Sequence, residues 1–191
     1  IEILAETATP TITPTTPPTP TPTRPPETYL DDGKIALLAG DYDAAFDIFQ
    51  QSLNRTSDPS VTAQAQFRLG QTLYYQEAYG QALDFLRQAA DQNEAEVAGQ
   101  ASYMMGDVLT ALQRYEEALA AYQTYLDLRP GIIDSHVYEQ RGNIYNTLGD
   151  YEQARENFEA AFRAEPERGI SPLTVKIAIA YENSGDTETA L

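Results

Sequence analysis

The sequence predicts an all-α protein in which antiparallel helix pairs stack into an α-solenoid. The main observation is a recurrence: Gly33, Gly70, Gly106 and Gly142 lie 37, 36 and 36 residues apart. Each is followed nine residues later by a tyrosine and twelve residues later by an alanine. Around these positions apolar residues recur every three or four residues, which is typical of amphipathic helices. A repeat of this length cannot bury its own apolar face, so it must stack on its neighbours.

Residues 1–28 form the first of two predicted regions, a Thr/Pro-rich extended linker or stalk. Residues 7–28 contain eight prolines and ten threonines. Proline fixes φ, removes a backbone donor and moves the preceding residue out of the α region. We therefore expect a semi-rigid polyproline II-like spacer that reaches roughly 60–70 Å. Two other roles stay open: carrying O-linked sugar, or docking into an aromatic-lined groove such as that of a neighbouring copy.

Residues 29–191 form the second region, the repeat domain, with about nine helices and no strands. The units span about residues 26–62, 63–98, 99–134 and 135–170, with a partial fifth over 171–191. Within a unit, glycine is expected to end the first helix and aspartate to cap the second, as in Gly40-Asp41 and Gly149-Asp150. Near the joins between units stand Pro59, Pro130 and Pro166, and Ser171-Pro172 predicts a further helix start.

The recurring small residues predict how the two helices of a pair touch. A glycine inside a helix costs about 1 kcal/mol relative to alanine. Four such glycines therefore imply crossings where the helices approach closely. The facing helix carries the recurring alanines, which are Ala45, Ala82, Ala118 and Ala154. Large side chains are expected to fill the space beside them: Phe49, Leu86, Tyr122 and Phe158.

Composition narrows the classes of partner. The formal net charge is −17, and residues 29–191 carry −15 of it. Such a surface repels phosphate backbones and anionic lipid, so nucleic acid is not an expected partner, whereas a basic protein or peptide is. The chain has no cysteine, which excludes disulfides, thiolate metal sites and a cysteine nucleophile. No run approaches the ~18 apolar residues of a membrane span, so direct membrane insertion is not expected.

The ends of the chain suggest where it works. It begins at Ile1 rather than methionine, so we expect an upstream segment, and Ile1-Glu2-Ile3-Leu4 would fit the edge of an excised anchor. Together with the stalk and the absence of cysteine, this favours an extracytoplasmic or cell-envelope location in a prokaryote. A cytoplasmic location is the alternative.

The units resemble tetratricopeptide repeats. That family has a small residue in the first helix, Tyr-x-x-Ala opening the second, then an aromatic residue, an alanine and a closing proline. The fourth unit matches through Gly142, Tyr145, Gly149, Tyr151, Ala154, Phe158, Ala161 and Pro166; the third departs at Tyr125. The units are 36–37 residues long where the family norm is 34, so longer turns between units are expected. Over residues 26–191 the resemblance implies four full repeats and a partial fifth in a right-handed superhelix, its concave face made by the first helices.

On this architecture, first-helix positions outside the core stripe would line a concave groove that binds a peptide or a helix. They combine amides, phenols and a few charges, which suits the reading of an extended peptide. The candidates are Arg68, Gln71, Tyr74, Tyr75, Gln100, Tyr103, Asp107, His136, Glu139, Asn143 and Asn146. Tyr74, Tyr75 and Tyr103 are the expected anchors, because tyrosine gives large contact area with little entropy loss. For any one residue, an ordinary solvated helix face is the alternative.

Catalysis, cofactors and metal binding are not expected. His136 has only Asp134 and Ser135 beside it in sequence, and adjacent helical residues point in different directions. We expect Asp134 or Ser135 to cap a helix and His136 to lie in its first turn. The paired acids near Asp31 and Asp41 lack the glycine and the twelfth-position glutamate of a calcium-binding loop.

Capture of a C-terminal carboxylate, as in one tetratricopeptide subfamily, is also not expected. That subfamily uses lysines on the concave face. The chain has only Lys34 and Lys176, and neither is expected to belong to such a cluster.

The partial fifth unit raises a question about the C-terminal edge. It stops at Leu191 inside its second helix, so Leu173, Ile177 and Ala180 are expected to lack most of their cover. Continuation into further repeats is the favoured explanation, and packing against another copy in a homo-oligomer is the alternative.

The sequence thus predicts a non-enzymatic protein–protein interaction scaffold. The alternatives are a self-assembly module that packs through its end faces, and an accessory domain of a larger protein.

Overall fold

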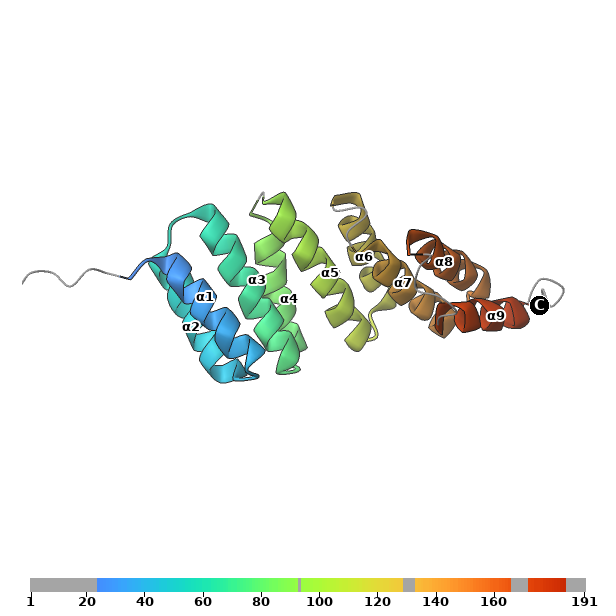
Figure 1. The fold of residues 1–191 in the computed structure, drawn as a ribbon, viewed down its shortest axis with the longest axis horizontal. Coiled ribbons are helices and arrows are strands. Elements are labelled where there is room, and N and C mark those ends of the chain that lie inside the picture. Colours follow the sequence, from blue (N-terminus) through green and yellow to red (C-terminus); the bar gives the residue numbers. More distant parts are fainter. Residues whose placement is uncertain (1–23, 93, 129–132, 166–171, 185–191) are drawn as a thin grey trace, which may run out of the picture.

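Stacked helix pairs make up the fold. The computed structural model describes residues 24–92, 94–128, 133–165 and 172–184. Within these ranges there are nine helices and no strands: α1 (Pro26–Leu38), α2 (Tyr42–Arg55), α3 (Pro59–Tyr75), α4 (Tyr79–Ala90), α5 (Ala95–Ala111), α6 (Tyr115–Leu128), α7 (Asp134–Leu148), α8 (Tyr151–Ala164) and α9 (Pro172–Ser184). The helices pack in pairs, α1 with α2 through α7 with α8, and α9 follows α8 (Figure 1). The predicted all-α solenoid is confirmed.

The first helix begins inside the segment predicted to be linker. Residues 26–28 were expected to be extended, but α1 starts at Pro26. Proline is tolerated there because the first turn of a helix has no acceptor for its N–H, and the fixed φ suits a helix. The prediction is therefore wrong for these three residues. Residues 1–23 of the predicted stalk lie outside the described residues.

The turns inside the helix pairs follow the predicted chemistry. Asp41 Oδ1 accepts the Ala44 N–H at 3.1 Å, and Asp150 Oδ1 accepts the Gln153 N–H at 3.2 Å. Gly40 and Gly149 take φ of 77° and 79°, the left-handed conformation that glycine adopts without penalty. At the same place in the second and third pairs, Glu77 and Gln113 adopt φ of 59°. The turn geometry is thus kept even where the glycine is missing.

Each recurring glycine forms a notch for a large side chain of the partner helix. A Cβ added at Gly106 would lie 2.4 Å from Tyr122 Cε1, and one at Gly142 would lie 2.5 Å from Phe158 Cε1. The same holds for Gly33 against Phe49 and for Gly70 against Leu86. The four facing alanines are fully buried. The predicted close crossing is confirmed, and the large side chain sits in the notch itself.

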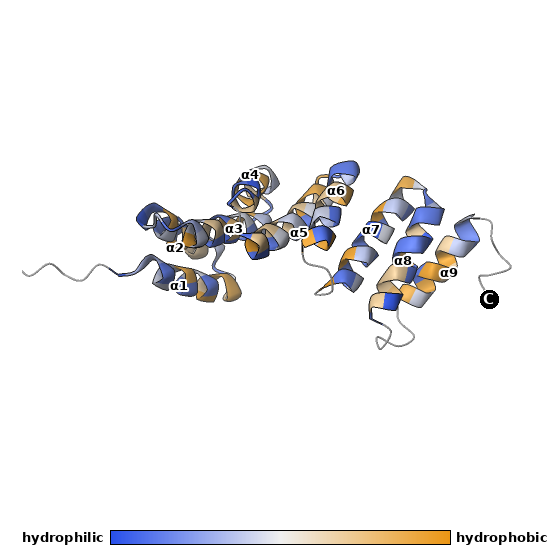
Figure 2. Ribbon diagram, turned by 90° about the horizontal axis from the view of Figure 1, so that it is seen from above, coloured by the Kyte–Doolittle hydropathy of each residue, from blue (hydrophilic) through white to orange (hydrophobic). Residues whose placement is uncertain are grey.

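The first and second helices of the pairs form two layers. From above, α4 and α6 lie along one side of α3 and α5 (Figure 2). The first helices also contact one another, α1 with α3 and α3 with α5. In a curved array the layer whose elements approach each other is the inner one. Helices α1, α3 and α5 therefore line the inner side of the array.

The joins between successive pairs are unequal. One continuous core runs from α3 to α7, with smaller cores over α1–α3 and α8–α9. The contact between α6 and α7 is much less extensive than those at the other joins. Polar contacts supplement it: Arg141 Nη1 donates to Gln123 Oε1 at 2.7 Å, and the Ile133 N–H donates to Tyr125 Oη at 3.1 Å.

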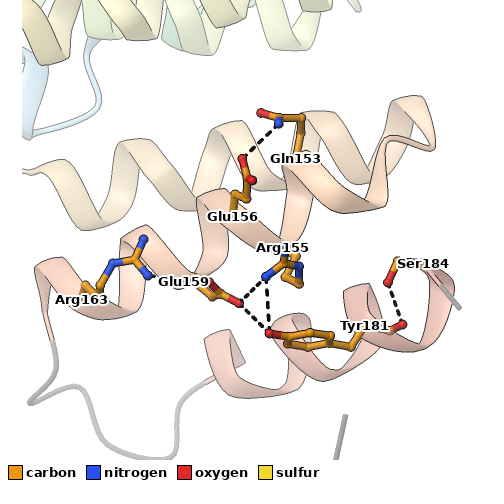
Figure 3. A network of polar contacts seen from close by, with 7 residues as sticks. All are labelled: Gln153, Arg155, Glu156, Glu159, Arg163, Tyr181 and Ser184. Carbon is orange, nitrogen blue, oxygen red and sulfur yellow. Dashed lines mark hydrogen bonds and ion pairs between the residues drawn. The ribbon is translucent and has the colours of Figure 1, made fainter. Parts of the chain in front are cut away.

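The C-terminal edge differs from the expectation. Leu173 and Ala180 were expected to lack cover, but they are 1% and 0% exposed because α8 packs over them. That prediction is wrong, since these positions face the preceding pair rather than the following helix. A polar network holds the same join: Tyr181 Oη donates to Glu159 Oε1 at 2.9 Å, and Arg155 Nη1 donates to the same oxygen at 3.0 Å (Figure 3).

Of the prolines predicted near the joins between units, Pro130 and Pro166 lie outside the described residues. Pro59 does lie at a join: α2 ends at Arg55, and Pro59 is the first residue of α3, directly after the N-cap Asp58. No helix in the described part of the chain combines the length and apolar character that a bilayer crossing needs.

Candidate functional site

All the predicted groove residues lie on first helices, where the repeat places them side by side. Helix α3 carries four of them, α5 three and α7 four: Arg68, Gln71, Tyr74 and Tyr75; Gln100, Tyr103 and Asp107; His136, Glu139, Asn143 and Asn146. Of these, Tyr75 and Asn146 are exposed and the rest are partly buried. The set forms a face of mixed polarity rather than a solvated charged surface.

Tyrosine rings form the centre of the face on α3. Tyr75 stacks on Tyr42 of α2, with ring centroids 5.6 Å apart and planes inclined by 14°. Tyr74 contacts Tyr75 edge-on at 5.5 Å and Tyr79 at 5.9 Å. Despite these contacts, 46% of Tyr75 remains exposed. It thus offers a large, positioned aromatic surface, which is typical of binding anchors.

A partly buried carboxylate lies beside the next ring. Tyr122 Oη donates to Asp107 Oδ1 at 2.6 Å, and Tyr103 also hydrogen-bonds to this carboxylate. Burial raises the pKa of Asp107, while the bonds from Tyr122 and Tyr103 oppose that rise. Burial and then the nearby Asp107 raise the pKa of Tyr103 and Tyr122 above their usual range. The phenols therefore stay protonated and hold the carboxylate in place.

Asp107→Asn should raise the stability of the protein at neutral pH. Because the folded pKa of Asp107 lies above its unfolded value, the folded state binds this proton more tightly. Its ionisation therefore costs stability, and this cost begins to fall as the pH drops through the folded pKa and is gone below the unfolded pKa. The asparagine oxygen still accepts from Tyr122. Urea unfolding of both proteins should show the largest difference at pH 7 and none below the ordinary aspartate pKa. A difference independent of pH would contradict this account.

The α7 residues are largely engaged with the rest of the protein. Lys176 of α9 donates to Glu139 Oε1 at 2.7 Å and to Asn143 Oδ1 at 2.9 Å. The His136 ring lies 6.0 Å from Tyr103, with its Nε2 3.3 Å from Gln140 Nε2. Glu139 and Asn143 are thus less available to a partner than the sequence suggested.

Helix α7 starts in a way that sequence reasoning only partly predicted. His136 does lie in the first turn. The N-cap, however, is Ile133, which has no side-chain capping bond, so Asp134 and Ser135 are the first helical residues and not caps. In the described part of the chain no group of three or more His, Asp or Glu side chains could hold a metal ion.

Two pockets open on this face at its N-terminal half. One, of about 360 Å³, lies between α1, α2 and α3 and is lined by Lys34, Leu37, Leu38, Tyr42, Arg68, Gln71 and Tyr75. The other, of about 280 Å³, lies between α3 and α5 and is lined by Ser60, Gln64, Phe67, Arg68, Glu94, Glu96, Val97 and Gln100. Arg68 borders both. A further pocket of about 460 Å³, at the start of α8 and the end of α9, contains none of the predicted residues.

The first pocket contains residues that sequence reasoning missed. Lys34 was not expected to belong to a carboxylate-capturing cluster of lysines, and it was not among the predicted groove residues, but it lines this pocket together with Arg68. A signal was present: Lys34 lies 37 residues before Gln71, and Leu37 and Leu38 lie 37 before Tyr74 and Tyr75. Extending the repeat offset into the first unit identifies all three.

Two family models together match most of the chain. Residues 27–131 match the model for the tetratricopeptide repeat-like domain, and residues 135–168 match that for the tetratricopeptide repeat. A comparison with curated proteins finds no match.

Solved structures share the fold at low sequence identity. A MamA protein is 23% identical, with a TM-score of 0.72 over 86% of this chain and 85% of its own. MamA from Desulfovibrio magneticus RS-1 is 19% identical, with a TM-score of 0.71 over 88% and 90%. YrrB, described as a TPR protein with an unusual peptide-binding site, is 22% identical, with a TM-score of 0.67 over 85% and 79%. The notched helix pairs and the family match agree, and the chain belongs to the tetratricopeptide repeat family.

Proposed function

We propose that the protein binds a peptide segment of a partner along the face formed by α1, α3, α5 and α7. The fold is that of a protein–protein interaction scaffold. The observation that carries the proposal is the half-exposed Tyr75, held in place by Tyr42 and Tyr74 and bordering a pocket. An aromatic ring fixed by its neighbours loses little entropy on binding, so its contact area contributes to affinity.

The face suits an extended segment more than a flat surface. Its two pockets share Arg68, so they follow one another from α1 to α5. Amides such as Gln71 and Gln100 line the pockets and have donors and acceptors for a peptide backbone. YrrB, which has a similar fold, is described as having a peptide-binding site. The net charge of −17 supports a partner that is basic overall.

Tyr75→Ala and Tyr103→Ala should each weaken peptide binding at least tenfold. Peptides selected from a random nine-residue library displayed on phage would be synthesised, and their Kd measured by isothermal titration calorimetry. Phe162→Ala is the matched control, because Phe162 is an aromatic residue of similar exposure on the second helix α8. Failure to select any peptide, or equal losses in all three variants, would contradict binding on this face.

A second proposal, end-to-end self-association, has one observation in its favour. Ile35 is 67% exposed, whereas the residues at the same offset in later units are buried by the preceding pair: Thr72, Val108, Ile144 and Ala180. A second copy stacked on α1 would cover it. Sedimentation velocity supports this proposal if mass rises with concentration, and a constant monomer mass removes it.

A further inference from the structure

Arg68 is a partly buried cation for which the described part of the chain supplies no acidic partner. Its Nη1 donates to Gln71 Oε1 at 2.7 Å, and its guanidinium carbon lies 5.1 Å from the Phe67 ring centroid. Within the described ranges no Asp or Glu lies within ion-pair distance of it. Burial lowers the pKa of Arg68, yet arginine keeps its charge in proteins. The chain has 29 Asp and Glu residues but only 12 Lys and Arg residues, so an acidic partner for Arg68 would be expected from composition alone.

A second cation, Lys34, lines the same pocket. Lys34 Nζ pairs with Asp31 at 3.1 Å, but most of the Asp31 side chain is exposed. Exposed pairs one turn apart on a helix contribute little energy, so an incoming anion can replace Asp31. None of the seven residues that line this pocket is acidic, whereas the neighbouring pocket contains Glu94 and Glu96. The local charge is therefore opposite to that of the whole chain.

Apolar surface adjoins the two cations. Leu38 is 88% exposed and lines the pocket together with Leu37 and the stacked rings of Tyr42 and Tyr75. An apolar side chain this exposed contributes little to folding, because little of it is removed from water. Its position beside fixed aromatic rings makes it available to an apolar group of a ligand. The pocket volume of about 360 Å³ falls within the range of ligand sites.

We propose that this pocket binds an acidic–apolar pair in the partner peptide: a side-chain carboxylate between Lys34 and Arg68, and an adjacent large apolar side chain against Leu38 and Tyr75. The proposal rests on the proposed function and specifies the partner's chemistry at one end of the face. A carboxylate fits better than a phosphate, because the net charge of −17 disfavours a doubly charged group more than a singly charged one. The partner would thus be basic overall but carry one acidic anchor.

To test this, nine-residue peptides are selected from the random phage library for binding to three proteins: the wild-type protein, the Arg68→Gln variant and the Lys34→Gln variant. Arg87→Gln is the matched control, since Arg87 is an exposed cation on the second helix α4. Wild-type and control selections should be enriched in Asp or Glu next to Leu, Ile, Phe or Tyr. The two pocket variants should lose the acidic enrichment. Because the readout is a preference among bound peptides, it does not depend on small changes in stability.

A selected peptide is then synthesised with both ends capped, and again with its Glu or Asp changed to the amide. On the wild-type protein the amide version should bind at least tenfold more weakly, and on Arg68→Gln the two versions should bind equally. A third version of the peptide has a free C-terminal carboxylate in place of the acidic side chain. It tests whether the pocket prefers a side-chain carboxylate or a terminal one. If this version binds more tightly than the version with the acidic side chain, the side-chain assignment is overturned.

The outcomes separate this inference from the proposed function. If peptides are selected and depend on Tyr75 and Tyr103 but show no acidic preference, the inference is overturned while peptide binding stands. If the preference survives in Arg68→Gln and Lys34→Gln, the anion binds elsewhere and the inference is again overturned. If no peptide is selected by any protein, both proposals fail.

Discussion

Phe158→Ala is expected to lower the free energy of unfolding by about 3–5 kcal/mol, the usual cost of truncating a buried aromatic residue. Phe158 is 2% exposed and occupies the notch made by Gly142. It belongs to the core shared by α8 and α9, and Lys176 Nζ lies 5.7 Å from its ring centroid. The cavity left by the missing ring cannot close easily, because α7 and α9, which pack on either side of α8, are held by many other contacts with it. Urea unfolding followed by circular dichroism measures the loss.

The matched control is Phe162→Ala, one turn later on the same helix. Phe162 is 38% exposed and is not part of the α8–α9 core, so its truncation should cost less than about 1 kcal/mol. Both variants replace the same residue type at a helical position, so differences in helix propensity cancel. Equal losses in the two variants would show that the notch does not hold Phe158 as described.

Gly106→Leu is expected to cost about 3 kcal/mol, the upper end of the range for an overpacked core. Even a Cβ at position 106 would lie 2.4 Å from Tyr122 Cε1, well inside van der Waals contact. Tyr122 cannot swing away, because it is buried and its hydroxyl donates to Asp107. The third helix pair would have to separate. Thermal melting and urea unfolding should both report the change.

Gly80→Ala gives the opposite result and serves as the control. Gly80 is also helical, but no atom lies within 4 Å of an added Cβ. Alanine there should stabilise the protein by about 0.5–1 kcal/mol through helix propensity. Combining Gly106→Leu with Tyr122→Ala should cost less than the sum of the single changes, because the leucine fills space left by the ring. Additive costs would mean that the two residues do not meet.

Much of the fold could be predicted because the repeat fixes it several times over. Gly106 and Tyr122 lie one unit apart from Gly142 and Phe158, so a single packing rule explains both pairs. The caps at Asp41 and Asp150 are likewise local, since each aspartate bonds to a backbone N–H three residues later. Interactions within one turn of a helix depend little on the rest of the chain.

The parts that could not be predicted depend on contacts between distant residues. The sequence does not show that Lys176 reaches across to Glu139, 37 positions earlier, and occupies part of the expected face. Nor does it show that Lys34 and Arg68 line the same pocket, because that results from the stacking of α1 on α3. The φ of 59° at Glu77 and Gln113 was also unforeseen, since side chains rarely adopt it and only the shared turn imposes it.

The sparse contact between α6 and α7 has a consequence for how the array comes apart. In repeat proteins, cooperativity depends on the coupling between neighbouring units, so the weakest coupling sets where partly unfolded states separate. Helices α7 to α9 should therefore exchange their amide hydrogens with solvent as one group, ahead of α3 to α5. The tyrosine-rich face would remain intact in such a state. The protein would thus unfold α7 to α9 transiently and still present the surface formed by α1, α3 and α5.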